Sequence, residues 1–321
     1  MRLDSIIYLG LSSGLIGLLS AWVFSILTYP VVRRVPAVCR HFPSDFWFGV
    51  GVAPLIIGIS FLGFSVGSGW LSLRGWLVDH CPLHQGHPHL CLTHIAQSPP
   101  GGFIFWLALG SGGCWIAYQA ARICLPGRSL FVRLSKASQP NGEYHLLPSK
   151  IAAAFTTGLL FPRVYLTTQA VKLLQPGERE AVLVHEQAHV QRRDPLRSLI
   201  LAFSEKCFPG MKPIRRRWQL AVETECDRAT VQAGFPNTLV AKTILKLKRA
   251  NQGQLAQATL LHYASTDDDA LRTRLELLLN DTVNDTWVKL LSILLPIFWL
   301  LSVLFFSEVH HAMETLLGWL S

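Results

Sequence analysis

The chain has 321 residues, of which 50% are hydrophobic and only 15% are charged, and its formal net charge is +9. So apolar a composition argues against an ordinary soluble enzyme. The positive charge would suit a nucleic-acid-binding protein, but 24 of the 29 Lys and Arg residues lie between Arg122 and Lys289, which argues against direct nucleic-acid binding.

Four apolar runs predict a membrane α-helical protein with four transmembrane helices. They cover about residues 5–32, 46–73, 102–121 and 290–307. Each run is close to the ~20 residues that a helix needs to cross the hydrocarbon core of a bilayer. A cleavable signal peptide is excluded for the first run, because the run is long and lacks a small-residue cleavage site.

The basic residues predict the orientation of these spans. Arg33, Arg34 and Arg40 follow the first run, whereas the loop between the second and third runs has only Arg74. By the positive-inside tendency we expect a multi-pass protein of the bacterial inner membrane with its large domain in the cytoplasm. The predicted divisions are 1–121 with three spans, 122–286 with the cytoplasmic domain, and 287–321 with the fourth span and a short external tail.

The loop between the second and third runs carries five His and two Cys within residues 79–94. One interpretation is a disulfide between Cys81 and Cys91 in an oxidising compartment, with solvated histidines. The other is an external metal sensor that binds copper or zinc. The two interpretations exclude each other only in part.

The segment after the third run predicts a small sheet. Short strands are expected at 129–134, 144–147, 151–157 and 163–166, with a turn at Asn141-Gly142. Within the third strand, Ala154, Phe155 and Thr156 are our candidate for a sheet edge that pairs with an extended substrate. The alternative for these residues is an inner core strand.

An H-E-x-x-H motif follows, in a helical run from Pro176 to about Arg192. His185 and His189 are four residues apart, so a helix projects them from one face about 5–6 Å apart. That spacing suits two imidazole ligands of one zinc ion. Glu186 lies beside them and can take a proton from a water molecule. The alternative is a surface helix with two chance histidines.

A third zinc ligand is expected from a later helix, predicted at about 217–231. Glu223 and Asp227 lie on one face of it, which makes Glu223 the natural ligand and Asp227 an acceptor that orients a ligand histidine. Glu225 is interpreted as a solvated acid. Asp194 is predicted to cap the next helix, whose first position is Pro195.

Together these motifs resemble the M56 family, the membrane gluzincin peptidases of the beta-lactam sensor-transducer type, over roughly residues 125–280. The resemblance implies an α+β zincin-like domain inserted between the third and fourth spans. It also implies that His185, His189 and Glu223 bind Zn²⁺ and that Glu186 is the general base. The motifs are L-F-P-R-V-Y-L at 160–166, H-E-x-x-H at 185–189, R-R-D at 192–194 and E-x-x-C-D at 223–227.

The sequence therefore predicts a membrane-anchored zinc endopeptidase that cuts a cytoplasmic or membrane protein in signal transduction. The resemblance suggests the chain itself or a cytoplasmic repressor as the protein substrate, and membrane lipid is the other expected partner. The family's external penicillin-binding sensor domain is expected to be absent. One alternative is a housekeeping membrane protease similar to the M48 family, and another is a metal-sensing receptor that uses the Cys/His loop. His145 and His262 are oxyanion-stabilising candidates by residue type alone, and the oligomeric state stays open.

Overall fold

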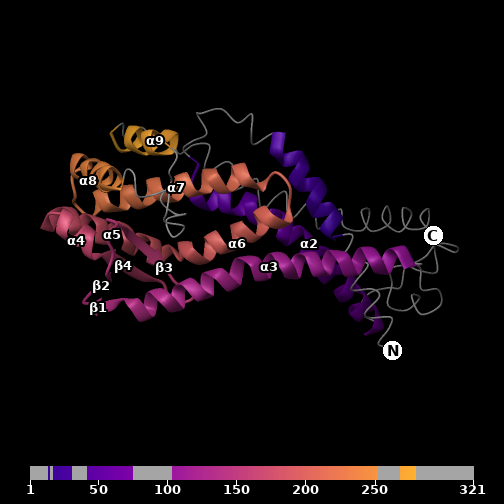
Figure 1. Ribbon diagram of the computed structural model, residues 1–321. Coiled ribbons are helices and arrows are strands. Elements are labelled where there is room, and N and C mark those ends of the chain that lie inside the picture. Colours follow the sequence, from indigo (N-terminus) through magenta and orange to yellow (C-terminus); the bar gives the residue numbers. More distant parts are fainter. Residues whose placement is uncertain (1–13, 15–16, 31–41, 75–102, 252–267, 280–321) are drawn as a thin grey trace.

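The computed structural model describes residues 14, 17–30, 42–74, 103–251 and 268–279. Residues 17–30 are helical. Figure 1 shows the long helix α3 along one side of the molecule, with α6 between it and α7, and α8 and α9 beyond α7 at the end that carries the sheet. The elements are, in chain order, α2 (Ser44–Leu73), α3 (Phe103–Ala137), β1 (Gln139–Asn141), β2 (Tyr144–Leu147), β3 (Ala154–Thr157), β4 (Arg163–Thr167), α4 (Thr168–Leu173), α5 (Pro176–Arg192), α6 (Asp194–Cys207), α7 (Met211–Gln232), α8 (Asn237–Ala250) and α9 (Asp268–Leu279).

The four described strands form one mixed sheet in the order β1-β2-β4-β3. Strand β2 pairs parallel with β4, and β3 pairs antiparallel with β4, with Phe155 opposite Tyr165. Four of the five residues of β4 are buried, as expected for an inner strand. Strand β3 stands at the edge of this sheet and packs against α5, so no strand among the described residues pairs with its outer side next to that helix.

Helix α5 has a well-defined start. Pro176 occupies its first turn, and the backbone N–H of Gln175 donates to Oε2 of Glu178 over 3.0 Å. Glu178 is only 1% exposed and also accepts from Nζ of Lys246 over 2.6 Å, which links α5 to α8. These contacts fix the helix that carries the H-E-x-x-H motif.

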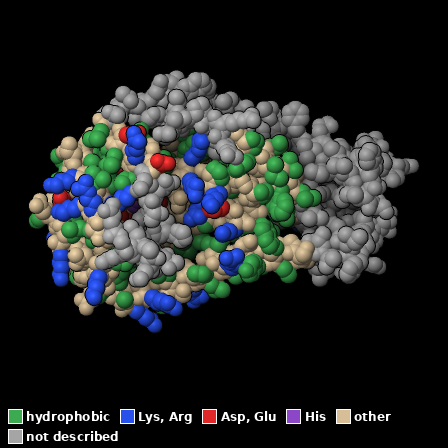
Figure 2. Space-filling view, turned by 45° about the horizontal axis from the view of Figure 1, so that its top comes forward, with side chains coloured by type: hydrophobic (Ala, Val, Ile, Leu, Met, Phe, Trp, Pro, Cys, Tyr) green, Lys and Arg blue, Asp and Glu red, His purple; other side chains and the backbone are tan. Residues whose placement is uncertain are grey.

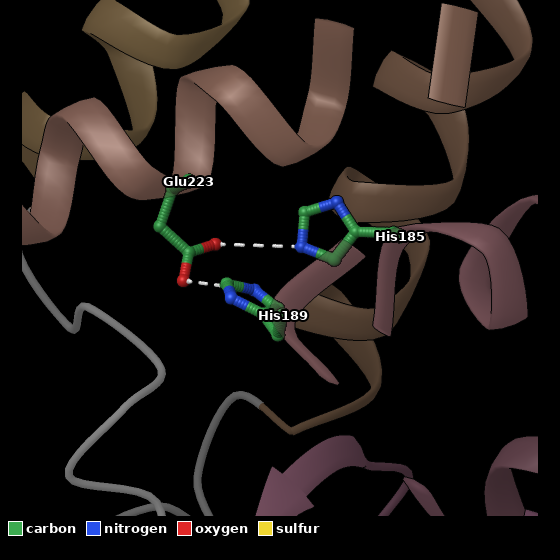
Figure 3. A group of neighbouring side chains, drawn as sticks. All are labelled: His185, His189 and Glu223. Atoms are coloured by element: carbon green, nitrogen blue, oxygen red, sulfur yellow. Dashed lines mark ion pairs between the residues drawn. The ribbon is translucent and has the colours of Figure 1, made fainter. Parts of the chain in front are cut away.

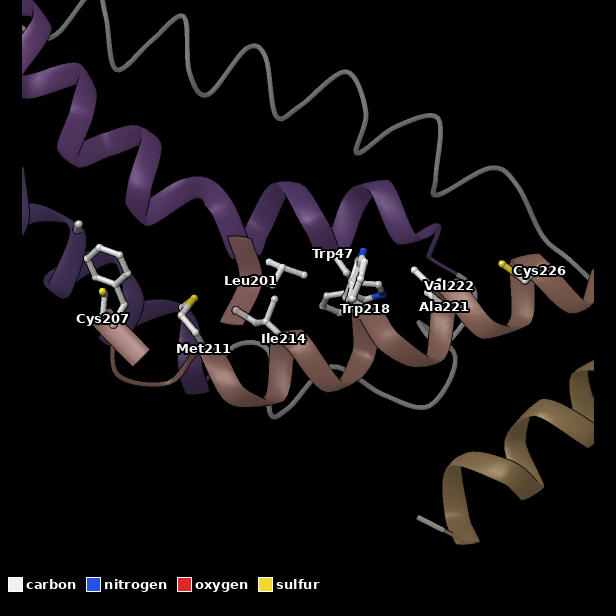
Figure 4. Packing of buried hydrophobic residues seen from close by; sticks show 11 residues of the cluster. Trp47, Leu201, Cys207, Met211, Ile214, Trp218, Ala221, Val222 and Cys226 are labelled. Atoms are coloured by element: carbon white, nitrogen blue, oxygen red, sulfur yellow. The ribbon is translucent and has the colours of Figure 1, made fainter. Parts of the chain in front are cut away.

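The main hydrophobic core lies between α2, α6 and α7 (Figure 4). Trp47 of α2 packs there against Ile214 and Trp218 of α7, and the three side chains are at most 3% exposed. At Gly51 a Cβ atom would lie 2.3 Å from Cδ2 of Leu201, so a larger residue there would have to displace the Leu201 side chain of α6.

The prediction of four transmembrane helices is wrong for the described residues: within them, no helix has both the length and the apolar character needed to cross a membrane. The second apolar run forms α2, but its Trp47 belongs to the core with α6 and α7. The third run forms only the first part of α3, which continues through four basic residues to Ala137. Hydropathy alone does not separate residues that pack on protein from residues that face lipid, which is why the prediction failed.

The predicted strand at 129–134 is also wrong, because these residues belong to α3. Leu130 and Leu134 are four residues apart and both line an internal cavity, whereas Val132 and Arg133 are exposed. This is the spacing of a helix with one inward face. Helix α3 is continuous across residue 121, and the predicted division of the chain into domains stays a prediction.

Several predictions fall outside the described residues. They concern the Cys81/Cys91 loop with its disulfide or metal, part of the first apolar run, the fourth run and His262. The cytoplasmic orientation stays a prediction.

Lys and Arg outnumber Asp and Glu on the face shown in Figure 2, in keeping with the net charge of +9.

Candidate metal centre and its cleft

Helix α5 presents the two histidines of the H-E-x-x-H motif on one face. The ring centroids of His185 and His189 are 5.0 Å apart, and the ring planes meet at 74°. Their side chains are 15% and 12% exposed, so the rings are largely enclosed but still accessible. One turn of helix therefore provides two imidazoles that can approach the same point.

Glu223 of α7 reaches that point from the opposite side (Figure 3). Its Oε2 lies 3.7 Å from Nε2 of His185, and its Oε1 lies 3.7 Å from Nε2 of His189. The three residues each offer one ligand atom, and these atoms lie within 4.8 Å of one another. Tetrahedral zinc with bonds of about 2.1 Å holds its ligand atoms about 3.4 Å apart, so these separations suit a metal ion.

Each histidine has a carboxylate behind its other ring nitrogen. Nδ1 of His185 lies 3.0 Å from Oδ1 of Asp227, and Nδ1 of His189 lies 2.8 Å from Oδ2 of Asp194. A histidine that donates its Nδ1–H to a carboxylate keeps the lone pair of Nε2 for a metal. Two imidazole nitrogens and one carboxylate oxygen are a donor set that fits zinc and leaves a fourth position for water or substrate.

The prediction that Asp194 caps α6 is wrong. The structure has Arg193 at the cap position, and Asp194 is the first residue of the helix, 5% exposed, with its side chain directed to His189. Arg193 adopts a left-handed conformation, with φ of 55°, and so turns the chain back between α5 and α6. A side chain five residues after His189 reaches its ring only because of this turn, which the sequence does not reveal.

Arg274 of α9 joins two of the acidic residues of α7, Glu223 and Asp227, and was not predicted from the sequence. Its Nε and Nη2 each donate to Asp227 over 2.9 Å, and its Nη1 lies 2.7 Å from Oε2 of Glu223. The side chain is 11% exposed. Asp227 is 47 residues earlier in the chain, and no local pattern around Arg274 marks it as a partner.

These contacts set the protonation of the cluster. Burial alone would lower the pKa of His185, but hydrogen bonds to Asp227 and Glu223 outweigh it and raise that pKa to about 10, so a metal that binds Nε2 has to release a proton from this ring. Burial opposes ionisation of Glu223 and Asp227, yet the charge of Arg274 and the bonds to His185 hold the pKa of both below its usual range. Both acids are therefore ionised at neutral pH, as a metal ligand and an acceptor of imidazole N–H need to be.

Glu186 lies next to the cluster and is held by the sheet. It is 7% exposed, and its Oε2 accepts a hydrogen bond from Oγ1 of Thr156 over 2.8 Å. The same hydroxyl lies 3.1 Å from the backbone oxygen of Glu186. Thr156 belongs to the edge strand β3, so the outer side of that strand and the acid are fixed relative to each other.

The cluster opens into a cavity of about 290 Å³. Its lining includes His185, Glu186, His189 and Glu223, together with β3 (Ala154–Thr157). Residues of α3 and α8 also line it, and these helices lie on opposite sides of α5 in Figure 1. A ligand in this cavity would contact the candidate metal ligands, the buried acid and a strand edge at once.

Two other sequence interpretations change. Glu225 is not a simple solvated acid: it accepts from the backbone N–H of Ser44 over 2.7 Å and from its hydroxyl over 2.9 Å, and it pairs with Arg192. His145 lies in β2 with its ring centroid 5.3 Å from that of Tyr165, and it does not line the cavity. His145 is therefore not placed to stabilise an oxyanion at the cluster.

A second group, formed by His189, Asp194 and Cys226, also has the spacing of a metal site. It uses Nδ1 of His189, which is already engaged with Asp194. Cys226 is fully buried, and burial raises the pKa of its thiol, whereas a metal needs the thiolate. The group at Nε2 is the better candidate.

Comparison with known families agrees with this geometry. The profile of the family described as BlaR1 peptidase M56 matches residues 133–278. This segment is an M56 peptidase domain. The resemblance seen in the sequence is thus confirmed for the part of the chain that supplies β1 to β4 and α4 to α9, and the M56 domain contains all the cluster residues described above. No curated protein and no solved structure matches the chain.

Proposed function

We propose that the protein is a zinc-dependent endopeptidase. The observation that carries the proposal is the convergence of Nε2 of His185, Nε2 of His189 and a carboxylate oxygen of Glu223 in a cavity that also contains Glu186. Zinc, when bound, supplies Lewis acidity toward a peptide carbonyl and lowers the pKa of a water molecule. The peptidase family of the domain supports the same chemistry.

The other roles in the proposed reaction belong to side chains of the protein. Glu186 accepts a proton from the attacking water and then gives it to the amine that leaves. The hydrogen bond from Thr156 fixes which way the carboxylate points, so its other oxygen can face the water. Asp194 and Asp227 keep the two histidines in the tautomer that binds a metal through Nε2.

The substrate that this geometry favours is an extended polypeptide. Strand β3 lines the cavity and stands at the edge of the sheet, so a substrate backbone can add to it as a further strand. Backbone pairing of this kind is independent of sequence and suits an endopeptidase. We include among the substrates this chain itself and a transcriptional repressor, as the family resemblance suggests.

A purely structural metal site is the less favourable interpretation. A structural zinc site uses four protein ligands and is closed. Among the described residues three ligands converge on one point, and they line a cavity that also contains the buried acid Glu186.

The decisive experiment compares Glu186→Gln with Glu180→Gln, an exposed glutamate on the same helix. Both purified full-length variants are assayed for zinc content and for cleavage of an unfolded protein and of the chain itself. We expect zinc to be retained in both, and cleavage to fall about 10²–10⁴-fold in Glu186→Gln alone. Equal cleavage by the two variants would remove Glu186 from the mechanism.

A further inference from the structure

The start of α2 is capped by an acid from another helix. Ser44 is the first residue of α2 and is fully buried. Its backbone N–H donates to Oε1 of Glu225 over 2.7 Å, and its hydroxyl donates to Oε2 of the same side chain over 2.9 Å. The first N–H groups of a helix have no partner within it and carry a partial positive charge, so a carboxylate suits this position. Glu225 therefore caps α2 from α7, the helix that α2 runs alongside (Figure 4).

The guanidinium of Arg192 connects this cap to the candidate metal centre. Arg192 is the last residue of α5, which also carries His189. Its Nη1 contacts Oε2 of Glu225, its Nη2 donates to Oγ of Ser44, and its Nε lies 3.5 Å from Oδ1 of Asp194. Nε of Arg192 and Oδ1 of Asp194 are both buried, and within the described part of the chain neither atom has a hydrogen-bond partner that competes with this ion pair. The other oxygen of Asp194 faces Nδ1 of His189 at 2.8 Å.

The hydroxyl of Ser44 has two roles that an apolar side chain cannot take over. It accepts from Arg192 and donates to Glu225, so it fixes both charged groups relative to α2. Ser and Thr hydroxyls can accept and donate in this way. The hydroxyl itself is uncharged, so its removal deletes no charge near the metal centre. An effect of Ser44 on zinc binding would therefore come from position and not from charge.

These residues act at a distance from the substrate. Ser44, Arg192 and Glu225 do not line the cavity, whereas Asp194 and His189 do. A substrate in the cavity would therefore not touch the cap of α2. The polar contacts described above reach the metal centre through Asp194.

The other histidine has a separate support. His185 faces Asp227, which is held by Arg274 of α9. As far as the structure describes the chain, these contacts share no residue with those of Arg192. The supports of the two histidines can therefore be removed one at a time.

We propose that Ser44 and Glu225 are positioning residues for His189. They act through Arg192 and Asp194, and they make zinc binding depend on the docking of α2 against α5 and α7. The proposal rests on the metal site of the proposed function, but it does not require peptide cleavage. Because coupling between two binding events is reciprocal, a partner that displaces the start of α2 would weaken zinc binding, and zinc would strengthen the docking of α2.

The first measurement is zinc competition with a chelator on the purified full-length protein. Ser44→Ala should lower zinc affinity about 3–10-fold, less than the about 10–100-fold typical when a carboxylate next to a ligand histidine is lost. Ser44→Thr keeps the hydroxyl and should restore the affinity. Asp45→Ala is the matched control: Asp45 is the next residue of α2, is 75% exposed and pairs with Arg197. An exposed ion pair contributes little, so this control should change zinc affinity less than about 2-fold. Unchanged affinity in Ser44→Ala, or an equal loss in Asp45→Ala, would overturn the proposal.

A double-mutant cycle separates positioning from a general loosening of the fold. Ser44→Ala is combined with Asp194→Ala and, separately, with Asp227→Ala. If Ser44 acts through Asp194, its effect on zinc affinity should shrink below about 2-fold in the Asp194→Ala background and keep its full size in the Asp227→Ala background. General loosening would weaken zinc binding equally in both backgrounds, and that result would refute the positioning role. If Ser44→Ala does not fold, Glu225→Gln takes its place in the same cycle, because it removes the charge that pairs with Arg192 but keeps an acceptor for the N–H of Ser44.

Cleavage kinetics distinguish a failure of this proposal from a failure of the peptidase function. Zinc competition needs no cleavage, so the cycle tests the positioning role even if the wild-type protein cuts no polypeptide. If the wild type does cut, Ser44→Ala at a fixed, limiting concentration of free zinc should lower kcat and change KM less than about 2-fold, because Ser44 does not touch the substrate. Normal zinc affinity and normal kcat in Ser44→Ala would leave the peptidase function standing and refute the positioning role.

Discussion

Replacing Arg274 by Met should weaken zinc binding, and the structure gives the reason. The guanidinium makes two bonds of 2.9 Å to Asp227 and a contact of 2.7 Å to Oε2 of Glu223. It therefore fixes one candidate ligand and also the carboxylate behind His185. Because Arg274 occupies Oε2, Oε1 of Glu223 is the oxygen that we expect to bind the metal.

Two effects of the Arg274→Met substitution oppose each other. Loss of a positive charge beside the cluster would favour a cation. However, Arg274 is the largest influence that keeps the pKa of Glu223 and Asp227 low against burial. Without Arg274, we expect one of these two acids to take up a proton. That proton offsets the lost positive charge of Arg274 and removes an acceptor of hydrogen bonds. The remaining effect is that the carboxylates of Glu223 and Asp227 are no longer held in position. Such losses typically lower metal affinity about 10–100-fold, or by about 1.4–2.8 kcal/mol.

The assay is competition for zinc between the purified protein and a chelator of known affinity. Arg274→Lys should be intermediate, because Lys keeps the charge but lacks the planar fork. Arg272→Met is the matched control on the same helix: Arg272 is 80% exposed and pairs only with Glu276 among the described residues. Zinc affinity that is unchanged or higher in Arg274→Met would refute the reasoning, since repulsion would then outweigh positioning.

Three further predictions concern the supports of the site. Asp194→Ala and Asp227→Ala should each lower zinc affinity about 10–100-fold, measured by the same competition, and an unaltered affinity would reduce either residue to a packing role. Burial would raise the pKa of Glu178, but its bonds to Lys246 and Gln175 hold it below the usual value. Its contribution to stability is thus present above its unfolded pKa of about 4.3 and is lost as pH falls through the folded value. Glu178→Gln should therefore lower the melting temperature more at pH 7 than at pH 3, and an equal shift at both would contradict this assignment. Ile214→Ala, at a fully buried core position, should reduce the free energy of unfolding by about 2–5 kcal/mol in chemical denaturation, and a loss under 1 kcal/mol would place Ile214 outside the core.

Local sequence patterns were informative where the partners lie on one helix or strand. The spacing of His185 and His189 defines a helix face whatever surrounds it, and strand β2 occupies the predicted residues 144–147. The E-x-x-C-D motif of α7 led to Glu223 because a third ligand was required by chemistry. Each of these inferences depends only on residues that are close in the chain.

The sequence was uninformative where contacts depend on tertiary structure. Arg274 is recognised only once α9 packs on α7, and Asp194 only once the chain reverses at Arg193. The hydropathy of residues 46–73 indicates burial but does not distinguish burial in lipid from burial against protein. A helix that packs on α6 and α7 was therefore predicted to cross the membrane. Residues 129–134 were predicted as a strand because several of them favour β-structure. This preference obscured the helical spacing of Leu130 and Leu134.

The M56 match begins at residue 133, yet the site is supported from outside it. Ser44, the first residue of α2, binds Glu225 of α7 through both its N–H and its hydroxyl, and Arg192 contacts both of these residues. Arg192 also lies 3.5 Å from Asp194, the carboxylate that holds His189. A continuous set of polar contacts therefore runs from the start of α2 to a candidate metal ligand, parallel to the apolar contact of α2 with α7. Arg192 and Glu225 are partly buried, so removing α2 would leave both charges without the polar contacts that Ser44 provides beside the site. The structural unit that holds the metal centre is thus larger than the segment that defines the family.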